Sequence, residues 1–159
     1  MTVQVLYKNK AKLTSSGAIT LFTEEKFQIK NLNRFLPKNS ALYADKILKN
    51  KKNTKENIIS FNINENTTLI LVSLKKDLKS SDVENLGAEF YNFIKKNSFK
   101  DLSILCESLK SKPGKDFIGR FVHGLKLKSY EFNIYKSKKI KNILTITLIG
   151  KQSALALKN

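Results

Sequence analysis

Residues 119–139 read G-R-F-V-H-G-L-K-L-K-S-Y-E-F-N-I-Y-K-S-K-K. The first part continues an amphipathic helix that we expect to begin at Asp116, because apolar residues recur there at helical spacing. One face carries Phe117, Phe121 and Leu125, with Ile118 and Val122 beside them. The second part is a tail in which aromatic and basic residues alternate. The stretch therefore predicts a long helix with one buried face and an aromatic, basic end.

The same stretch contains the pattern Gly124-Leu125-x-Leu127-x-Ser129-Tyr130-x-Phe132-x-x-Tyr135-Lys136-Ser137-Lys138-Lys139. This pattern resembles a segment of the leucyl (cytosol) aminopeptidase family, where it closes the last long helix of the N-terminal, non-catalytic domain. The resemblance implies a macro-domain-like fold for this chain. It also implies that the chemistry belongs to a C-terminal catalytic domain, in which a Lys, several Asp and a Glu hold two divalent metals, zinc or manganese. The family's Asn-Thr-Asp-Ala-Glu-Gly-Arg metal motif does not occur here.

The composition is that of one soluble globular domain. The chain has 159 residues, 41% of them hydrophobic and 27% charged, which is enough to bury a core without a disulfide or a structural metal. The single cysteine, Cys106, cannot pair within the chain, which favours a reducing, intracellular setting. Residues 1–8 do not have the pattern of a signal peptide, and no apolar run approaches the ~20 residues of a membrane span. We therefore expect a cytoplasmic protein without a membrane partner.

The net charge of +17 raises the alternative of a lysine-rich nucleic-acid-binding module. Only Arg34 and Arg120 are arginines, so the other 28 of the 30 basic residues are lysines. Lysine is a flexible point charge, whereas bidentate recognition of bases and phosphates depends on arginine. Lysine, asparagine and isoleucine are abundant together, which is typical of AT-rich codon usage. The composition favours this explanation and predicts at most weak, non-specific nucleic acid binding.

Hydrophobic patterning predicts an α/β fold: a mixed β-sheet flanked by helices on both faces. This fold class agrees with the macro-domain-like fold that the resemblance implies. We expect strands at residues 3–7, 18–22, 57–63, 67–74, 101–106 and 142–149, and helices at residues 41–50, at 81–97 and from Asp116 onward.

Two of these helices carry specific expectations. For residues 81–97, Ser81 and Glu84 have the spacing of a capping box, and an apolar stripe is formed by Val83, Leu86, Phe90 and Ile94. Gly87 lies beside the stripe and would permit close approach to a sheet. For residues 41–50, we expect Asn39 or Ser40 to cap the helix after Pro37. Its inward residues would be Leu42, Ile47 and Leu48.

No side chain of this chain is predicted to be catalytic or to bind a metal or cofactor. His123 is the only histidine, and we expect it on the side of its helix away from Phe121, with neither a nucleophile nor an orienting partner. Cys106 ends a buried strand beside the anionic Glu107, so we interpret it as core filling rather than as a reactive thiol.

Metal and phosphate sites are also not indicated. The carboxylates are dispersed, and the adjacent pair Glu24-Glu25 precedes Lys26 in what looks like a solvated surface. Macro domains bind ADP-ribose through glycine-rich loops after their strands, and aminopeptidase relatives usually have Gly-x-Gly after the fourth strand. Here that loop reads S-L-K-K-D at residues 73–77, which argues against a phosphate cradle. A macro-like ligand-binding domain nevertheless remains an alternative.

The aromatic, basic tail has two interpretations. Aromatic residues between cations can stack bases and hold phosphates, and Tyr130, Phe132 and Tyr135 lie among Lys126, Lys128, Lys136, Lys138 and Lys139. The alternative is that Tyr130 and Phe132 pack onto the core in a strand-like alternation while the lysines line a solvated rim. We favour packing.

We therefore interpret residues 1–150 as the N-terminal domain of a leucyl aminopeptidase-like protein, and residues 151–159 as the start of an interdomain linker. The catalytic domain is absent from these 159 residues. The resemblance implies that the domain's partner is this catalytic domain, that the parent protein is a homohexamer, and that the parent removes N-terminal residues such as leucine from peptides.

Overall fold

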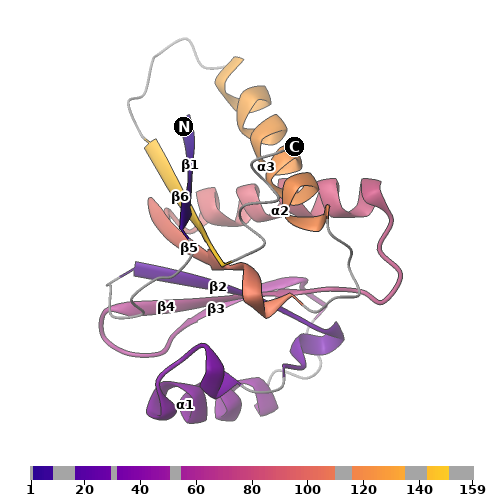
Figure 1. Ribbon diagram of the computed structural model, residues 1–159. Helices are drawn as coiled ribbons and strands as arrows, with labels where there is room; N and C mark the ends of the chain where they lie inside the picture. The colour runs from indigo at the N-terminus through magenta and orange to yellow at the C-terminus, as the bar shows by residue number, and fades with distance from the viewer. Residues whose placement is uncertain are drawn as a thin grey trace.

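The computed structural model describes residues 2–8, 17–29, 32–50, 55–109, 116–134 and 143–150. The strands of these ranges form one sheet in the order β1-β6-β5-β2-β4-β3 (Figure 1). Their bounds are Thr2–Lys8 for β1, Gly17–Thr23 for β2, Ile58–Asn62 for β3, Thr67–Ser73 for β4, Asp101–Leu105 for β5 and Ile143–Ile149 for β6. All neighbouring pairs are parallel except β3 with β4, which confirms the mixed sheet.

The helices cover both faces of this sheet, as the sequence predicts. They are α1 at Lys38–Asn50, α2 at Ser80–Lys96 and α3 at Phe117–Ile134, with short 3-10 turns η1 at Glu25–Phe27, η2 at Leu32–Arg34 and η3 at Cys106–Ser108. In Figure 1, α1 lies beneath β2, β4 and β3, whereas α2 and α3 lie above the sheet. The connections through α2 and α3 return the chain to parallel strands, as βαβ units require.

Side chains point alternately to the two faces of the sheet, so each face has its own hydrophobic cluster. Ala18 and Phe22 of β2 belong to the cluster under α2 and α3, and Ile19 and Leu21 belong to the cluster beside α1. The middle of β4, residues 69–72, is fully buried. It is covered on both faces, which explains its continuous apolar sequence.

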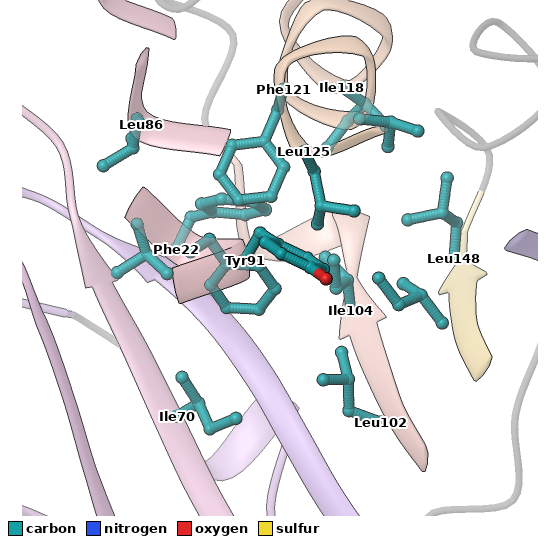
Figure 2. Close-up of a cluster of buried hydrophobic side chains, with 14 of the residues drawn as sticks. Phe22, Ile70, Leu86, Tyr91, Leu102, Ile104, Ile118, Phe121, Leu125 and Leu148 are labelled. Carbon is teal, nitrogen blue, oxygen red and sulfur yellow. The ribbon is translucent and has the colours of Figure 1, made fainter. Parts of the chain in front are cut away.

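An aromatic cluster lies at the centre of the larger hydrophobic cluster (Figure 2). The ring of Phe121 is 5.3 Å from Phe22, in an edge-on arrangement, and 5.3 Å from Phe90. It stacks on Phe117 at 6.0 Å. Figure 2 also shows the Tyr91 hydroxyl among apolar side chains, and this buried oxygen has no hydrogen-bond partner among the described residues. The apolar faces predicted for residues 81–97 and for the helix after Asp116 are thus confirmed.

Two glycines let α2 and α3 cross in backbone contact. A Cβ atom added at Gly87 would lie 2.0 Å from the carbonyl oxygen of Phe121, and one at Gly124 would lie 2.0 Å from the carbonyl oxygen of Glu84. The expectation that Gly87 approaches a sheet was therefore wrong. Its stripe packs on the sheet, but the glycine lies on the flank of that stripe, where the neighbouring helix passes.

Helix α1 begins earlier and packs differently than predicted. It starts at Lys38, and the amide of Ala41 donates to the carbonyl oxygen of Pro37 at 2.9 Å. Proline at this position costs no hydrogen bond, because the first amides of a helix have no intrahelical acceptor. The buried residues are Ser40, Ala41 and Ala44, and Leu42 is 53% exposed, so the prediction of Leu42 as inward was wrong. The small residues allow α1 to lie close to the sheet.

The start of α2 also corrects the sequence interpretation. The Asp82 carboxylate accepts a hydrogen bond from the Lys79 amide at 3.0 Å, so Asp82 has the role that was assigned to Glu84 in a capping box. The helix begins at Ser80, one residue before the prediction. Asp82 also lies in the first turn, where its charge complements the helix dipole.

The end of α3 contradicts the strand-like interpretation of the tail. The helix continues to Ile134, and Tyr130 is 65% exposed. At helical spacing Tyr130 shares its face with the exposed His123 and Leu127, so it cannot pack onto the core. The side chain of Phe132, residues 135–142, the turn at 112–115 and the linker predicted at 151–159 lie outside the described residues.

Candidate functional site

Open α/β folds bind ligands at the carboxyl ends of their strands. The ligand lies next to the position in the sheet from which the chain continues to strands on opposite sides. Here that point lies between β2 and β5, because the chain passes from β2 toward β4 and β3 on one side and from β5 toward β6 on the other. The turn η3 occupies it. Ser108 Oγ accepts a hydrogen bond from the Phe22 amide at 2.9 Å and donates one to the carbonyl oxygen of Leu105 at 2.6 Å. The strand ends are thereby bonded to each other.

The loop after β4, at residues 73–77, is also closed by internal hydrogen bonds. The Leu74 amide donates to the carbonyl oxygen of Thr23 at 2.9 Å, and the Lys76 amide donates to Glu25 Oε1 at 3.2 Å. Phosphate cradles depend on several convergent, unengaged backbone amides. Because the Leu74 and Lys76 amides already have acceptors, one of them a carboxylate, these two amides are not available to bind a phosphate.

A second carboxylate lies at the end of β6. Gly150 turns the chain there with φ +123°, and its amide donates to the carbonyl oxygen of Lys8 at 2.9 Å. A Cβ at Gly150 would lie 2.9 Å from Glu107 Cγ, so the Glu107 side chain fills the space beside this turn. Glu25 and Glu107 thus place negative charge at the edge where a nucleotide ligand would bring its phosphates.

His123 lies elsewhere, in a shallow surface hollow of about 250 Å³ along α2 and α3. The other lining residues are Glu84, Asp116, Gly119 and Arg120. Nothing in the sequence predicted that Glu84 and Asp116 lie near His123. The i, i+3 spacing of Arg120 and His123 could have indicated their shared face, but only the crossing of the helices adds Glu84. The hollow contains acidic and basic groups and opens to solvent.

Cys106 is fully buried, which confirms its interpretation as core filling. Burial raises the pKa of its thiol to about 12, and the nearby Glu107 adds to this effect. The sulfur donates weakly to the carbonyl oxygen of Ile104 at 3.9 Å. A buried thiol with this pKa is protonated at neutral pH, which does not favour a role as a nucleophile.

This pKa predicts a pH dependence of stability. The unfolded thiol ionises near its ordinary pKa of 9.0, but the folded thiol does not ionise until about 12. The stabilisation from the neutral buried thiol is therefore complete below pH 9 and is lost as the pH rises toward 12. Relative to Cys106→Ala, the unfolding free energy should fall by up to about 1.4 kcal/mol per pH unit in this window. Urea denaturation of both proteins from pH 7 to 11 checks this, and a constant difference between them would contradict it.

No group of three or more His, Cys, Asp or Glu side chains in the described part of the chain is arranged to hold a metal ion. The helices among the described residues include none that is long and apolar enough to cross a membrane.

The comparison with known protein families confirms the family predicted from residues 119–139. The model of the cytosol aminopeptidase family's N-terminal domain matches residues 21–139. The chain belongs to this family, as its N-terminal domain. The match ends at the Lys139 that ended the sequence pattern and extends back to β2. Among curated proteins, no match was found.

Solved structures show the same fold. A variant of tomato leucine aminopeptidase superposes with a TM-score of 0.62 and 14% identity, over 99% of this chain and 35% of that chain. This domain thus spans about a third of that enzyme. The macro domain of ganglioside induced differentiation associated protein 2 superposes with a TM-score of 0.69 and 12% identity, over 99% of this chain and 81% of that chain. These neighbours confirm the macro-domain-like fold.

A Trypanosoma brucei macrodomain in complex with ADP-ribose is also similar. Its TM-score is 0.68 with 8% identity, over 98% of this chain and 68% of that chain. At this identity the likeness concerns the fold alone. The bonded strand ends and the two carboxylates at the carboxyl edge are features of this chain's own residues.

Proposed function

We propose that this domain is a non-catalytic partner of a two-metal aminopeptidase catalytic domain. The observation that carries the proposal is the family match over residues 21–139. The parent protein would be cytoplasmic and hexameric and would remove N-terminal residues such as leucine from peptides. The domain's part would be structural: it would pack on the catalytic domain, shape access to its site and support the hexamer.

The metals of this proposal, zinc or manganese, belong to the catalytic domain. They would polarise the scissile carbonyl and activate a water molecule there. The described residues of this chain contain no group of three or more His, Cys, Asp or Glu side chains placed to hold a metal ion, so the proposal assigns both metals to the catalytic domain.

A macro-like ligand-binding function is less well supported. It requires unengaged amides and a neutral or basic carboxyl edge. In this structure the Lys76 amide is bonded to Glu25, and Ser108 Oγ occupies the Phe22 amide. Glu107 adds a second carboxylate beside Gly150. An ADP-ribose pyrophosphate would have to displace these contacts and approach two like charges.

Weak, non-specific contact with nucleic acid is the second candidate. The exposed ring of Tyr130 and the net charge of +17 favour it. Lysine-dominated contacts of this kind neutralise phosphates without reading sequence, and they weaken steeply as salt rises.

The proposed function is tested by comparing the 159-residue chain with the polypeptide in which it is joined to its catalytic domain. The chain alone should not hydrolyse leucyl-p-nitroanilide with Mn²⁺ or Zn²⁺ present, whereas the joined polypeptide should. Release of p-nitroaniline is followed in both samples at equal molar concentration. Turnover that scales with the purified chain alone would overturn the proposal, as would a joined polypeptide in which deleting residues 1–150 changes neither activity nor assembly.

A further inference from the structure

Strand β1 is an edge of the sheet. Within the described ranges it pairs with β6, beside which it lies in Figure 1, and with no other strand. None of the residues from Val3 to Lys8 is buried, whereas most of the neighbouring β6 is. An edge strand presents a row of unpaired backbone amides and carbonyls, which is a template for another strand. The edge of β1 is therefore accessible to a further strand.

One hydrogen bond shows which backbone groups of β1 are used by β6. The Gly150 amide donates to the carbonyl oxygen of Lys8 at 2.9 Å, as the parallel register of the two strands requires. Backbone groups of successive residues point to opposite edges of a strand, so the even-numbered residues of β1 bond toward β6. The amides and carbonyl oxygens of Val3, Val5 and Tyr7 consequently point away from the sheet.

The strand lacks the features that usually protect an exposed edge. Protected edge strands are short, bulged or charged, or they contain proline. In contrast, β1 has seven residues, and its register with β6 is uninterrupted from Thr2 to Lys8. Residues 2–7 include no Pro, Lys, Arg, Asp or Glu. The opposite edge strand, β3, has only five residues, of which the first two are buried. The long, unprotected edge is thus a property of β1.

A second copy of β1 fits this edge by symmetry. Two copies related by a two-fold axis meet as antiparallel strands, and each presents the same backbone groups to the other. Full overlap of residues 2–8 places Val5 opposite Val5 of the second copy, and Val3 opposite Tyr7 of the second copy. These are the residues whose amides and carbonyls point outward, so each opposed pair can exchange both hydrogen bonds.

The charge of the chain also favours this arrangement. A net charge of +17 opposes the association of two copies, so they can meet closely only where charge is low. The overlap places Lys8, the charged residue of β1, opposite Thr2 of the second copy. The two Lys8 residues then lie about 20 Å apart along the strands, which exceeds the screening length of about 8 Å at physiological salt. A nucleic acid would instead need cations along β1.

We infer that β1 is a self-association edge, through which two copies of this chain pair into one continuous sheet. The inference concerns the 159-residue chain itself and does not depend on the proposed function. One strand pair is a small contact beside a standard protein interface, so the dimer is reversible and forms at high protein concentration. Salt strengthens it, because salt screens the repulsion between the two net charges.

Sedimentation equilibrium over a concentration series, at low and at high salt, measures the dimer. Leu6→Lys adds a charge beside the edge at a side chain that is 39% exposed, and the control Leu42→Lys adds the same charge to α1 at one that is 53% exposed. Leu6→Lys should weaken the dimer about tenfold or more, because edge lysines oppose strand pairing, and Leu42→Lys should weaken it much less. Equal dimerisation of the two variants would overturn the inference, as would a chain that stays monomeric at every concentration and salt.

Disulfide cross-linking tests the register. Gln4 and Leu6 of the second copy would form a non-hydrogen-bonded pair with Cα atoms about 4.5 Å apart, which is within the range of a disulfide. A mixture of Gln4→Cys and Leu6→Cys chains should therefore give a disulfide-linked dimer under mild oxidation. Each variant alone should not, because its two cysteines would be diagonal neighbours about 7–8 Å apart. The native Cys106 is buried and does not compete. Non-reducing gel electrophoresis compares the samples, and a yield in the mixture no higher than in the separate variants would overturn the inference.

Discussion

Replacing Gly87 with valine is expected to lower the unfolding free energy by about 3 kcal/mol or more. A Cβ there would lie 2.0 Å from the Phe121 carbonyl oxygen and 3.0 Å from the Leu125 amide nitrogen. These are backbone atoms of α3 and cannot rotate away, so the two helices must separate. A glycine-to-alanine change inside a helix ordinarily gains about 1 kcal/mol, and this gain is much smaller than the cost of separation.

Urea denaturation measures the effect, with Asn92→Val as the matched control in α2. Asn92 is exposed, so this variant introduces the same side chain into the same helix without a clash. Gly124→Val should behave like Gly87→Val, because its Cβ would meet the Glu84 backbone at 2.0 Å. A Gly87→Val protein as stable as the control would show that α2 and α3 do not cross in backbone contact.

Truncation of Phe121 to alanine is the second large expected effect, at about 3–5 kcal/mol. Its ring contacts Phe22, Phe90 and Phe117 and is completely buried. The cavity would lie between the sheet and both helices of this face, where no flexible surface side chain can fill it. Removal of the ring also ends three aromatic contacts that contribute beyond the buried area.

Thermal and urea unfolding of Phe121→Ala are compared with those of Leu127→Ala. Leu127 is on the same helix but is 48% exposed, so its truncation should cost much less. Similar losses of stability in the two variants would mean that the faces of α3 are wrongly assigned.

The exposed and buried faces of the helices were predictable to the extent that apolar side chains marked them. The stripe of α2 and the Phe117–Phe121–Leu125 face of α3 are dense in large apolar residues, and both are buried as predicted. On α1 the same rule failed, because the contact is made by Ser40, Ala41 and Ala44. A small-residue contact has no hydrophobic signal, so Leu42 was assigned inward although it faces solvent.

The aromatic tail shows a different limit. Alternation of Tyr130 and Phe132 matches a strand period, but α3 continues through this region to Ile134. A helix that is already packed through Phe121 and Leu125 can extend at little cost, because each further residue adds a hydrogen bond. The alternation of Tyr130 and Phe132 was therefore a weaker predictor of secondary structure than the helix that precedes them.

The sequence by itself determined the family, the α/β class and the two apolar helix faces, because residues 119–139 and the hydrophobic periods are local properties of the chain. The tertiary structure decided the rest. Only the packing of helices shows that Gly87 and Gly124 meet the backbone of the opposite helix, and only the strand order places Ser108 against Phe22. Likewise, β1 and β6 lie at opposite ends of the described chain, and only the strand order brings them side by side. Contacts between distant segments leave no local pattern, since their energy comes from surfaces that the fold itself brings together.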